Sequence, residues 1–136
     1  MTDGHPDLAG HRDGLARGEP RAQRCTGCGR VWWPPRPACP RCQCPDHAWT
    51  PLPDRGTLFT WTVVHHTRLP GFRDAVPYAV GMVDLPEAGV RVIGRITAPP
   101  GALTVGMPLR RVLAAPPGGG DAQPVWEPLT EEVAAR

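Results

Sequence analysis

Three residue types are missing from this chain, which has no serine, no lysine and no asparagine. Without serine a Ser-His-Asp triad cannot be built, and without lysine no Schiff base can form with a carbonyl substrate. Aromatic residues make up only 6% of the 136 residues, which leaves few platforms on which nucleic-acid bases stack. All 15 basic side chains are arginine, whose planar guanidinium suits bidentate binding of phosphate or carboxylate.

Long apolar runs and a strong charge imbalance are also missing. No segment approaches the ~20 apolar residues of a membrane span, and the N-terminus has no apolar stretch. The net charge is +2; residues 1–53 carry seven Arg against five acidic residues, whereas residues 54–136 carry eight of each. Nucleic-acid modules usually show a basic stripe, which these counts do not. We therefore expect a cytoplasmic protein with no membrane span, and the charge disfavours nucleic acid as a partner.

The most specific feature that the chain does contain is a pair of Cys-x-x-Cys motifs. Cys25 and Cys28 form the first motif, and Cys39 and Cys42 form the second after a spacer of ten residues. Two such turns supply the four thiolates of a tetrahedral zinc site. Glycines in and after the first motif let backbone amides turn toward the sulfurs. The pattern predicts a rubredoxin-like zinc ribbon with a structural Zn²⁺ and no open coordination position for catalysis.

Other interpretations of the cysteines stay open at this point. Iron fits the same spacing, and a redox-active Cys-x-x-Cys motif is a further alternative. Disulfides are disfavoured because the count of five cysteines is odd. Cys44 could replace Cys42, with His47 as another ligand, but Cys39 and Cys42 make the tighter turn. We expect Cys44 to be a bystander thiol.

The rest of the sequence predicts a mainly β protein. Five segments rich in β-branched and aromatic residues predict strands at 57–64, 78–85, 90–96, 109–113 and 125–129. Gly81 and Gly94 lie inside two of them, and mid-strand glycines permit the coiling that closes a small barrel. The predicted fold is a short N-terminal helix, a zinc ribbon and a five-stranded OB-fold barrel. The expected boundaries are 1–19 for a loose tail (1–8) and helix (11–17), 20–53 for the ribbon, 54–130 for the barrel and 131–136 for a C-terminal tail.

No catalytic constellation emerges from the sequence. His65 and His66 stand where a predicted strand ends, and adjacent strand residues point to opposite sides, so we do not expect them to bind one metal together. Asp74 and Asp84 are nominal partners for a catalytic histidine, but no pattern places either beside one. We therefore predict no catalytic residue.

Several segments together resemble a known family. They are residues 24–30 and 33–42, which hold the two cysteine motifs, and residues 56–65, 77–85 and 105–109. In this order they are similar to the DUF35 family of OB-fold proteins associated with acyl-CoA enzymes, over about residues 11–129. The resemblance implies an N-terminal helix, a rubredoxin-like zinc ribbon and a C-terminal OB fold. Residues 8–12 lack the aromatic that usually opens the family's helix.

The resemblance also implies a role beside a larger enzyme. Family members are small subunits of thiolase-like enzymes, of steroid side-chain aldolases built on lipid-transfer-type thiolases, and of MaoC-type enoyl-CoA hydratases. We expect a non-catalytic accessory subunit that assembles with a thiolase-like enzyme (lipid-transfer-type thiolase, aldolase or ketoacyl synthase), as in steroid or lipid side-chain degradation. A subunit of a MaoC-type hydratase and a single-stranded nucleic-acid-binding OB protein are the alternatives. A stand-alone enzyme ranks last.

In that role the chain would help to bind or channel the substrate, so a CoA thioester is a candidate ligand. Arginine would meet the phosphates of CoA as a planar fork. The candidates by chemistry are Arg68 and Arg73 in the loop at 65–77, and Arg91 and Arg95 on one face of the third predicted strand. The alternative for each of them is an ordinary solvated surface arginine.

Overall fold

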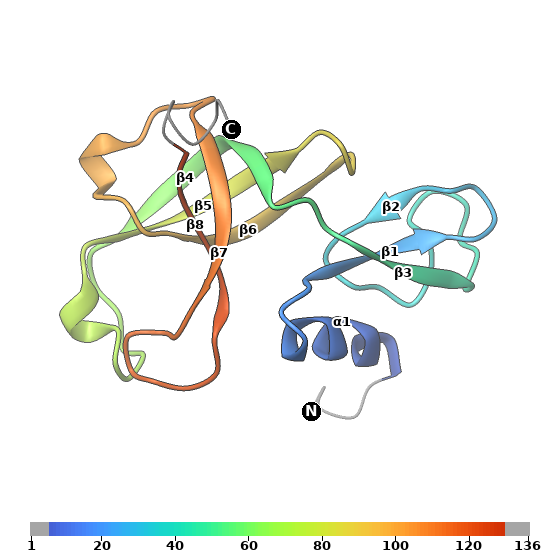
Figure 1. Cartoon of the computed structure of the whole chain (residues 1–136), viewed down its shortest axis with the longest axis horizontal. Coiled ribbons are helices and arrows are strands. Elements are labelled where there is room, and N and C mark those ends of the chain that lie inside the picture. Colours follow the sequence, from blue (N-terminus) through green and yellow to red (C-terminus); the bar gives the residue numbers. More distant parts are fainter. Residues whose placement is uncertain (1–5, 130–136) are drawn as a thin grey trace. The chain divides into compact units, whose positions relative to one another are not determined.

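The computed structural model describes residues 6–129, which fall into two compact units (Figure 1). The first, here called the ribbon unit, comprises residues up to 53 together with the turn 86–90. The second, the barrel unit, comprises residues 54–85 and residues from 91 onward. The tail expected at 131–136 and most of the tail expected at 1–8 lie outside the described residues.

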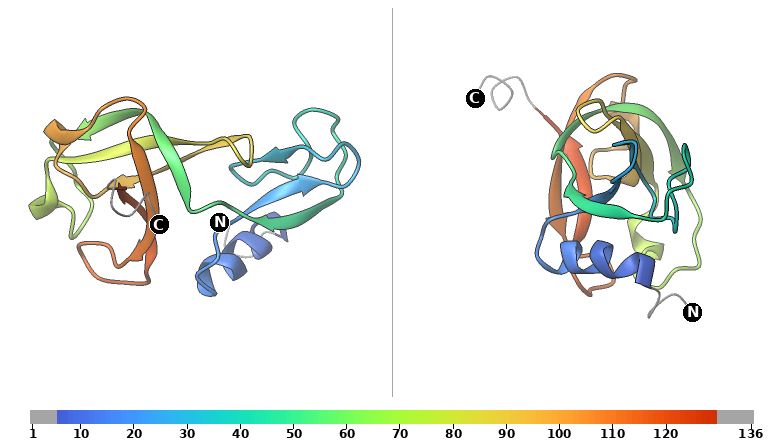
Figure 2. Two further views of the ribbon diagram at one scale, coloured as in Figure 1. Left: turned by 45° about the horizontal axis from the view of Figure 1, so that its top comes forward. Right: turned by 90° about the vertical axis from the view of Figure 1, so that its right-hand side faces the viewer.

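The ribbon unit consists of one helix and a small antiparallel sheet. Helix α1 spans Pro6–Ala16, and strands β1 (Arg21–Cys25), β2 (Val31–Trp32) and β3 (His47–Pro51) form a sheet in the order β2-β1-β3. In β1, Gln23 pairs with Trp32 on one side and with Trp49 on the other. Helix α1 contacts β1 and β3 (Figure 2).

Helix α1 begins at Pro6, so the predictions of a helix starting at residue 11 and a loose tail through residue 8 were wrong there. Proline is well suited to the first turn of a helix. Gly10 and Gly14 are unfavourable in this helix because glycine has a low helix propensity. In the structure they are the points of close packing: a Cβ at Gly10 would lie 2.1 Å from the indole nitrogen of Trp49. Packing against the sheet thus outweighs the propensity cost of the two glycines.

The barrel unit contains the five strands that the sequence predicted, each within two residues of its expected ends. They are β4 (Arg55–Val64), β5 (Tyr78–Leu85), β6 (Val90–Ile96), β7 (Pro108–Ala114) and β8 (Gln123–Pro128). They close into a barrel in the order β4-β5-β6-β8-β7, in which β6 and β8 run parallel (Figure 2). Two 3₁₀ turns, Arg73–Ala75 and Pro100–Ala102, lie in connecting loops. The predicted fold class is confirmed.

The barrel core explains one of the mid-strand glycines directly. Leu58, Val83, Ile96 and Leu109 are buried with at most 2% of their surface exposed. A Cβ at Gly81 would lie 2.9 Å from side-chain atoms of both Leu58 and Ile96. The missing side chain at Gly81 therefore makes room for the core that fills the closed barrel. Within residues 6–129, no helix is long and apolar enough to cross a membrane.

Candidate metal centre

The two Cys-x-x-Cys motifs fold into matching turns in the ribbon unit. Cys25 ends β1, and the Gly29 N–H donates to the Cys25 carbonyl at 3.0 Å. In the second turn the Gln43 N–H donates to the Cys39 carbonyl at 2.9 Å. The residue after each motif adopts a left-handed conformation, with φ of 80° at Gly29 and 64° at Gln43. Each turn thereby brings its two thiols to the same side.

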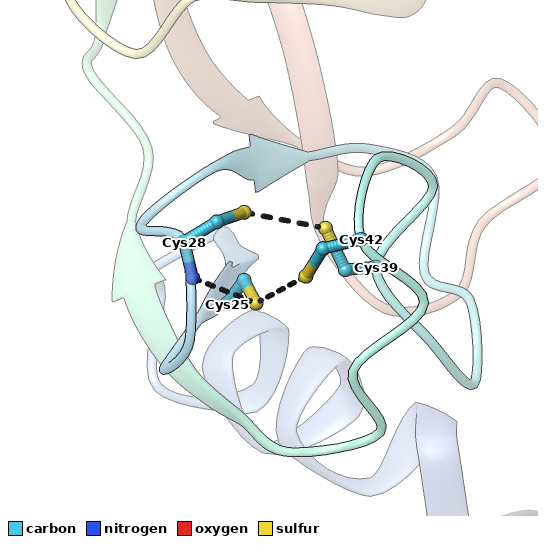
Figure 3. Close-up of side chains that lie close together, drawn as sticks. All are labelled: Cys25, Cys28, Cys39 and Cys42. Carbon is cyan, nitrogen blue, oxygen red and sulfur yellow. Dashed lines mark hydrogen bonds between the residues drawn. The ribbon is translucent and has the colours of Figure 1, made fainter.

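The turns place four sulfurs in one cluster (Figure 3). The Sγ atoms of Cys25, Cys28, Cys39 and Cys42 all lie within 4.8 Å of one another. Sγ of Cys25 is 3.5 Å from that of Cys42, and Sγ of Cys28 is 3.7 Å from that of Cys39. A tetrahedron of sulfurs with Zn–S bonds of about 2.3 Å has edges of about 3.8 Å. The donor set and its spacing therefore fit Zn²⁺.

Backbone amides prepare two of these sulfurs to be thiolates. The N–H groups of Gly27 and Cys28 point at Sγ of Cys25, at 3.3 and 3.4 Å, and the Arg41 N–H points at Sγ of Cys39 at 3.4 Å. The bond from the Cys28 N–H lowers the pKa of Cys25 to about 6. Burial raises the pKa of Cys39, but the N–H groups of Cys42 and Arg41 outweigh it and lower that pKa.

Cys42 titrates in the opposite direction from Cys25. The Cys44 N–H lowers the pKa of Cys42, but its side-chain hydrogen bond to Cys25 and its burial raise that pKa to about 12. The two thiols are hydrogen-bonded to each other, so without a cation their titrations are coupled. A divalent cation replaces the thiol protons and lets all four sulfurs carry charge.

The alternative ligands lie outside this cluster. Sγ of Cys44 is 3.8 Å from the carbonyl oxygen of Asp46. Nε2 of His47 is 3.2 Å from the side-chain nitrogen of Gln23, and the His47 ring packs edge-on against that of Trp49, with 5.5 Å between ring centroids. In the described part of the chain, neither side chain joins the four thiols.

Gln23 was missed in the sequence, although its side chain connects β1 to the spacer between the two motifs. It is 0% exposed. Its Oε1 accepts from the Arg36 N–H at 2.7 Å, and its Nε2 donates to the Arg36 carbonyl at 2.8 Å. The amide thus ties β1 to the spacer between the cysteine motifs. A glutamine in a short strand gives no sequence signal for this role, because the partner is backbone 13 residues away.

The four candidate arginines divide into one pair that shares a pocket and two residues that do not line it. Arg68 and Arg73 line an open pocket of about 500 Å³ in the connection between β4 and β5. Arg91 instead lies over the Phe59 ring, 3.7 Å from its centroid, and its Nε is 3.9 Å from the Asp84 carboxylate. Arg95 lies on β6 and is half-buried.

His65 and His66 line the same pocket as Arg68 and Arg73. Because β4 ends at Val64, the alternation of a strand does not apply to these two residues. That they do not bind one metal together stays a prediction.

Comparison with known proteins agrees with both units. Residues 12–46 match the family model described as the rubredoxin-like zinc ribbon domain of ChsH2, and residues 49–114 match the C-terminal OB-fold domain of ChsH2. Over 100 residues the chain is 31% identical to a "DUF35 domain-containing scaffold protein" of Methanocaldococcus jannaschii, covering 72% of this chain and 70% of that protein. The chain belongs to the DUF35 family.

Other relatives of this DUF35 protein are named as parts of acyl-CoA enzymes. It is 31% identical to "Benzoylsuccinyl-CoA thiolase subunit BbsA" of Thauera aromatica, over 75% of this chain and 68% of that one. It is 32% identical to the "Probable enoyl-CoA hydratase alpha subunit" of Thermomonospora curvata over 64% of this chain. That match spans only 27% of the hydratase subunit.

A solved structure matches almost the whole of this DUF35 protein. It is described as "Ltp2-ChsH2(DUF35) aldolase". The TM-score is 0.82 at 26% sequence identity, and the match covers 96% of this chain and 100% of that one.

Proposed function

We propose that this DUF35 protein is a non-catalytic accessory subunit that assembles with a thiolase-like acyl-CoA enzyme. The observation that carries this is the end-to-end structural match to the DUF35 chain of an aldolase, which includes both the ribbon and the barrel. The identity to a thiolase subunit over 68% of that subunit supports the same class of partner. The setting we favour is degradation of steroid or lipid side chains.

The metal in this proposal is structural. Cys25, Cys28, Cys39 and Cys42 would hold Zn²⁺ and supply all four of its ligands, which leaves no position for a substrate. When bound, the ion neutralises the thiolates and ties the two turns together. The ribbon contributes few other buried apolar side chains near the turns, with Trp32 packed beside Cys25 and Cys39. Its fold therefore depends on the metal.

The same proposal gives the barrel a part in binding or channelling an acyl-CoA thioester. CoA carries phosphates, and Arg68, Arg73, Arg91 and Arg95 are the arginines we consider for contact with them. The chain has no serine or lysine to act as a nucleophile, and its five cysteines lie in the ribbon. The chemistry would belong to the partner.

A hydratase partner is the second candidate, because the identity to a hydratase alpha subunit favours it. That relative is much longer than the matched segment, which covers 27% of it. Single-stranded nucleic acid is a weaker candidate, since residues 54–136 have a net charge of zero.

Co-expression with acyl-CoA enzymes encoded beside this gene tests the proposal. We expect a thiolase-like enzyme to co-elute with this chain in size-exclusion chromatography and to need it for full activity. Co-elution with a hydratase alone would favour the second candidate. If neighbouring thiolases and hydratases are soluble, fully active and unbound without this chain, the proposal is wrong.

A further inference from the structure

The connection between β4 and β5, residues 65–77, carries groups that neither the fold nor the metal centre uses. We infer that its pocket is a phosphate-binding site, which takes a phosphate ester larger than inorganic phosphate. The inference rests on the proposed function in one respect: an acyl-CoA is the ester that the proposed complex would present.

The charge in the pocket is unbalanced toward cations. Arg68 and Arg73 both line it, and within residues 6–129 neither guanidinium has an ion-pair partner. The acidic residue of this connection, Asp74, is exposed and does not line the pocket. Two guanidinium forks can contact the oxygens of a phosphate from two directions, whereas one fork already satisfies the two coplanar oxygens of a carboxylate.

The other lining groups are donors or apolar. Oγ1 of Thr67 accepts from the Leu69 N–H at 3.1 Å, so its hydroxyl proton is free to donate to an anion. His65 and His66 each offer an imidazole N–H, and Val76 supplies an apolar wall. A volume of about 500 Å³ exceeds the size of one phosphate group and falls in the range of pockets that hold organic ligands.

The pocket is held in shape by contacts from other parts of the barrel unit. The Phe72 ring packs on Tyr78 of β5, with 5.5 Å between centroids, and the 3₁₀ turn Arg73–Ala75 follows it directly. Gly71 meets Gly118 of the connection between β7 and β8: a Cβ on Gly71 would lie 2.2 Å from the Gly118 Cα. We call this backbone contact the glycine brace. It holds the backbone of the segment between the two arginines before a ligand arrives.

Isothermal titration of the zinc-loaded full chain tests the inference with three probes: CoA, inorganic pyrophosphate and pantetheine, which has no phosphate. We expect CoA and pyrophosphate to bind and pantetheine not to. Arg68→Gln combined with Arg73→Gln should weaken CoA binding at least tenfold. The matched control is Arg55→Gln, an equal charge change on an exposed arginine of β4 outside the pocket.

The probes also separate two sources of phosphate. CoA binding at least tenfold tighter than pyrophosphate binding identifies an ester of CoA type, whereas equal affinities identify a site for free polyphosphate and refute the ester. The inference would be overturned if neither CoA nor pyrophosphate binds, or if the double variant binds CoA as tightly as the unmutated chain does. It would also be overturned if Arg55→Gln loses as much CoA affinity as the double variant. Co-elution with the partner enzyme is measured on the same variants. If the double variant still co-elutes with the partner enzyme and binds CoA as before, the pocket is refuted and the proposed function is not. If the unmutated chain does not co-elute with any such enzyme, the proposed function is refuted and the pocket is not.

Discussion

Gln23 provides a sharp test of how the ribbon is held together. Its amide makes two hydrogen bonds to the backbone of Arg36 and lies 3.2 Å from Nε2 of His47. Gln23→Leu keeps an apolar stem of similar length at this buried position but removes every one of these contacts. The spacer between the cysteine motifs then loses its tie to β1, while the four thiols themselves are untouched.

The size of the effect follows from the two backbone groups of Arg36. A buried donor or acceptor left without a partner costs about 1–3 kcal/mol. The Arg36 side chain is exposed, so water reaches part of this backbone and the lower end of that range applies. We expect the ribbon to be destabilised by about 2–3 kcal/mol. Since every 1.4 kcal/mol is a factor of ten, zinc release through opening of the ribbon should accelerate roughly 30- to 100-fold.

A chelator chase measures this directly. The zinc-loaded protein is mixed with an excess of a chromogenic chelator, and the rate of metal transfer is followed for Gln23→Leu and for the unmutated chain. Gln123→Leu is the control, because Gln123 is exposed on β8 and the chemical change is the same. A release rate for Gln23→Leu within twofold of that for Gln123→Leu would refute the reasoning.

Three further predictions concern the metal, a strained residue and the glycine brace. Cys25→Ala should abolish stoichiometric zinc binding and unfold the ribbon, which is measured as protease cleavage within residues 20–53. Removal of zinc with a chelator should have the same effect, and a chelated chain that resists the protease would contradict this prediction. Gln43→Gly should stabilise the ribbon by up to about 1 kcal/mol in urea unfolding, because glycine adopts a φ of 64° without strain; a loss of stability contradicts this. Gly118→Ala should weaken CoA binding several-fold at an unchanged melting temperature, because its Cβ would lie 3.0 Å from the Gly71 Cα. The control Gly101→Ala, whose Cβ would meet nothing within 4 Å, should leave CoA binding unchanged. Equal CoA affinities for the two variants would contradict the glycine brace.

Features that depend on short-range pattern could be predicted from the sequence. The cysteine spacing predicted which thiols meet, because two tight turns leave little freedom in where their sulfurs point. The five barrel strands were predicted for a similar reason, because the segments are rich in β-branched and aromatic residues. In both cases the signal lies within one turn or one strand.

Features that depend on contacts between distant segments could not be predicted. The start of α1 was missed, and only contacts with residues outside the helix show why it contains glycines: Gly10 packs against Trp49 of β3, and Gly14 against Glu19 and Arg21. Gln23 carries no signal because its partner is the backbone of Arg36. The sequence placed two candidate arginines in a loop and two on a strand but did not show which of them have partners. The ring and carboxylate neighbours of Arg91 come from β4 and β5.

Taken together, the contacts separate what holds this protein together from what could bind a ligand. In the ribbon, the thiols and the Gln23 amide are all engaged with the chain itself, and a four-thiolate metal would complete that set. In the barrel, Arg68 and Arg73 are the opposite case: two permanent cations in one pocket, with no described residue to neutralise them. Two like charges without a partner contribute little to the free energy of folding, whereas an anionic ligand needs such a pair of cations. The search for ligand contacts therefore belongs in the connection between β4 and β5, away from the metal.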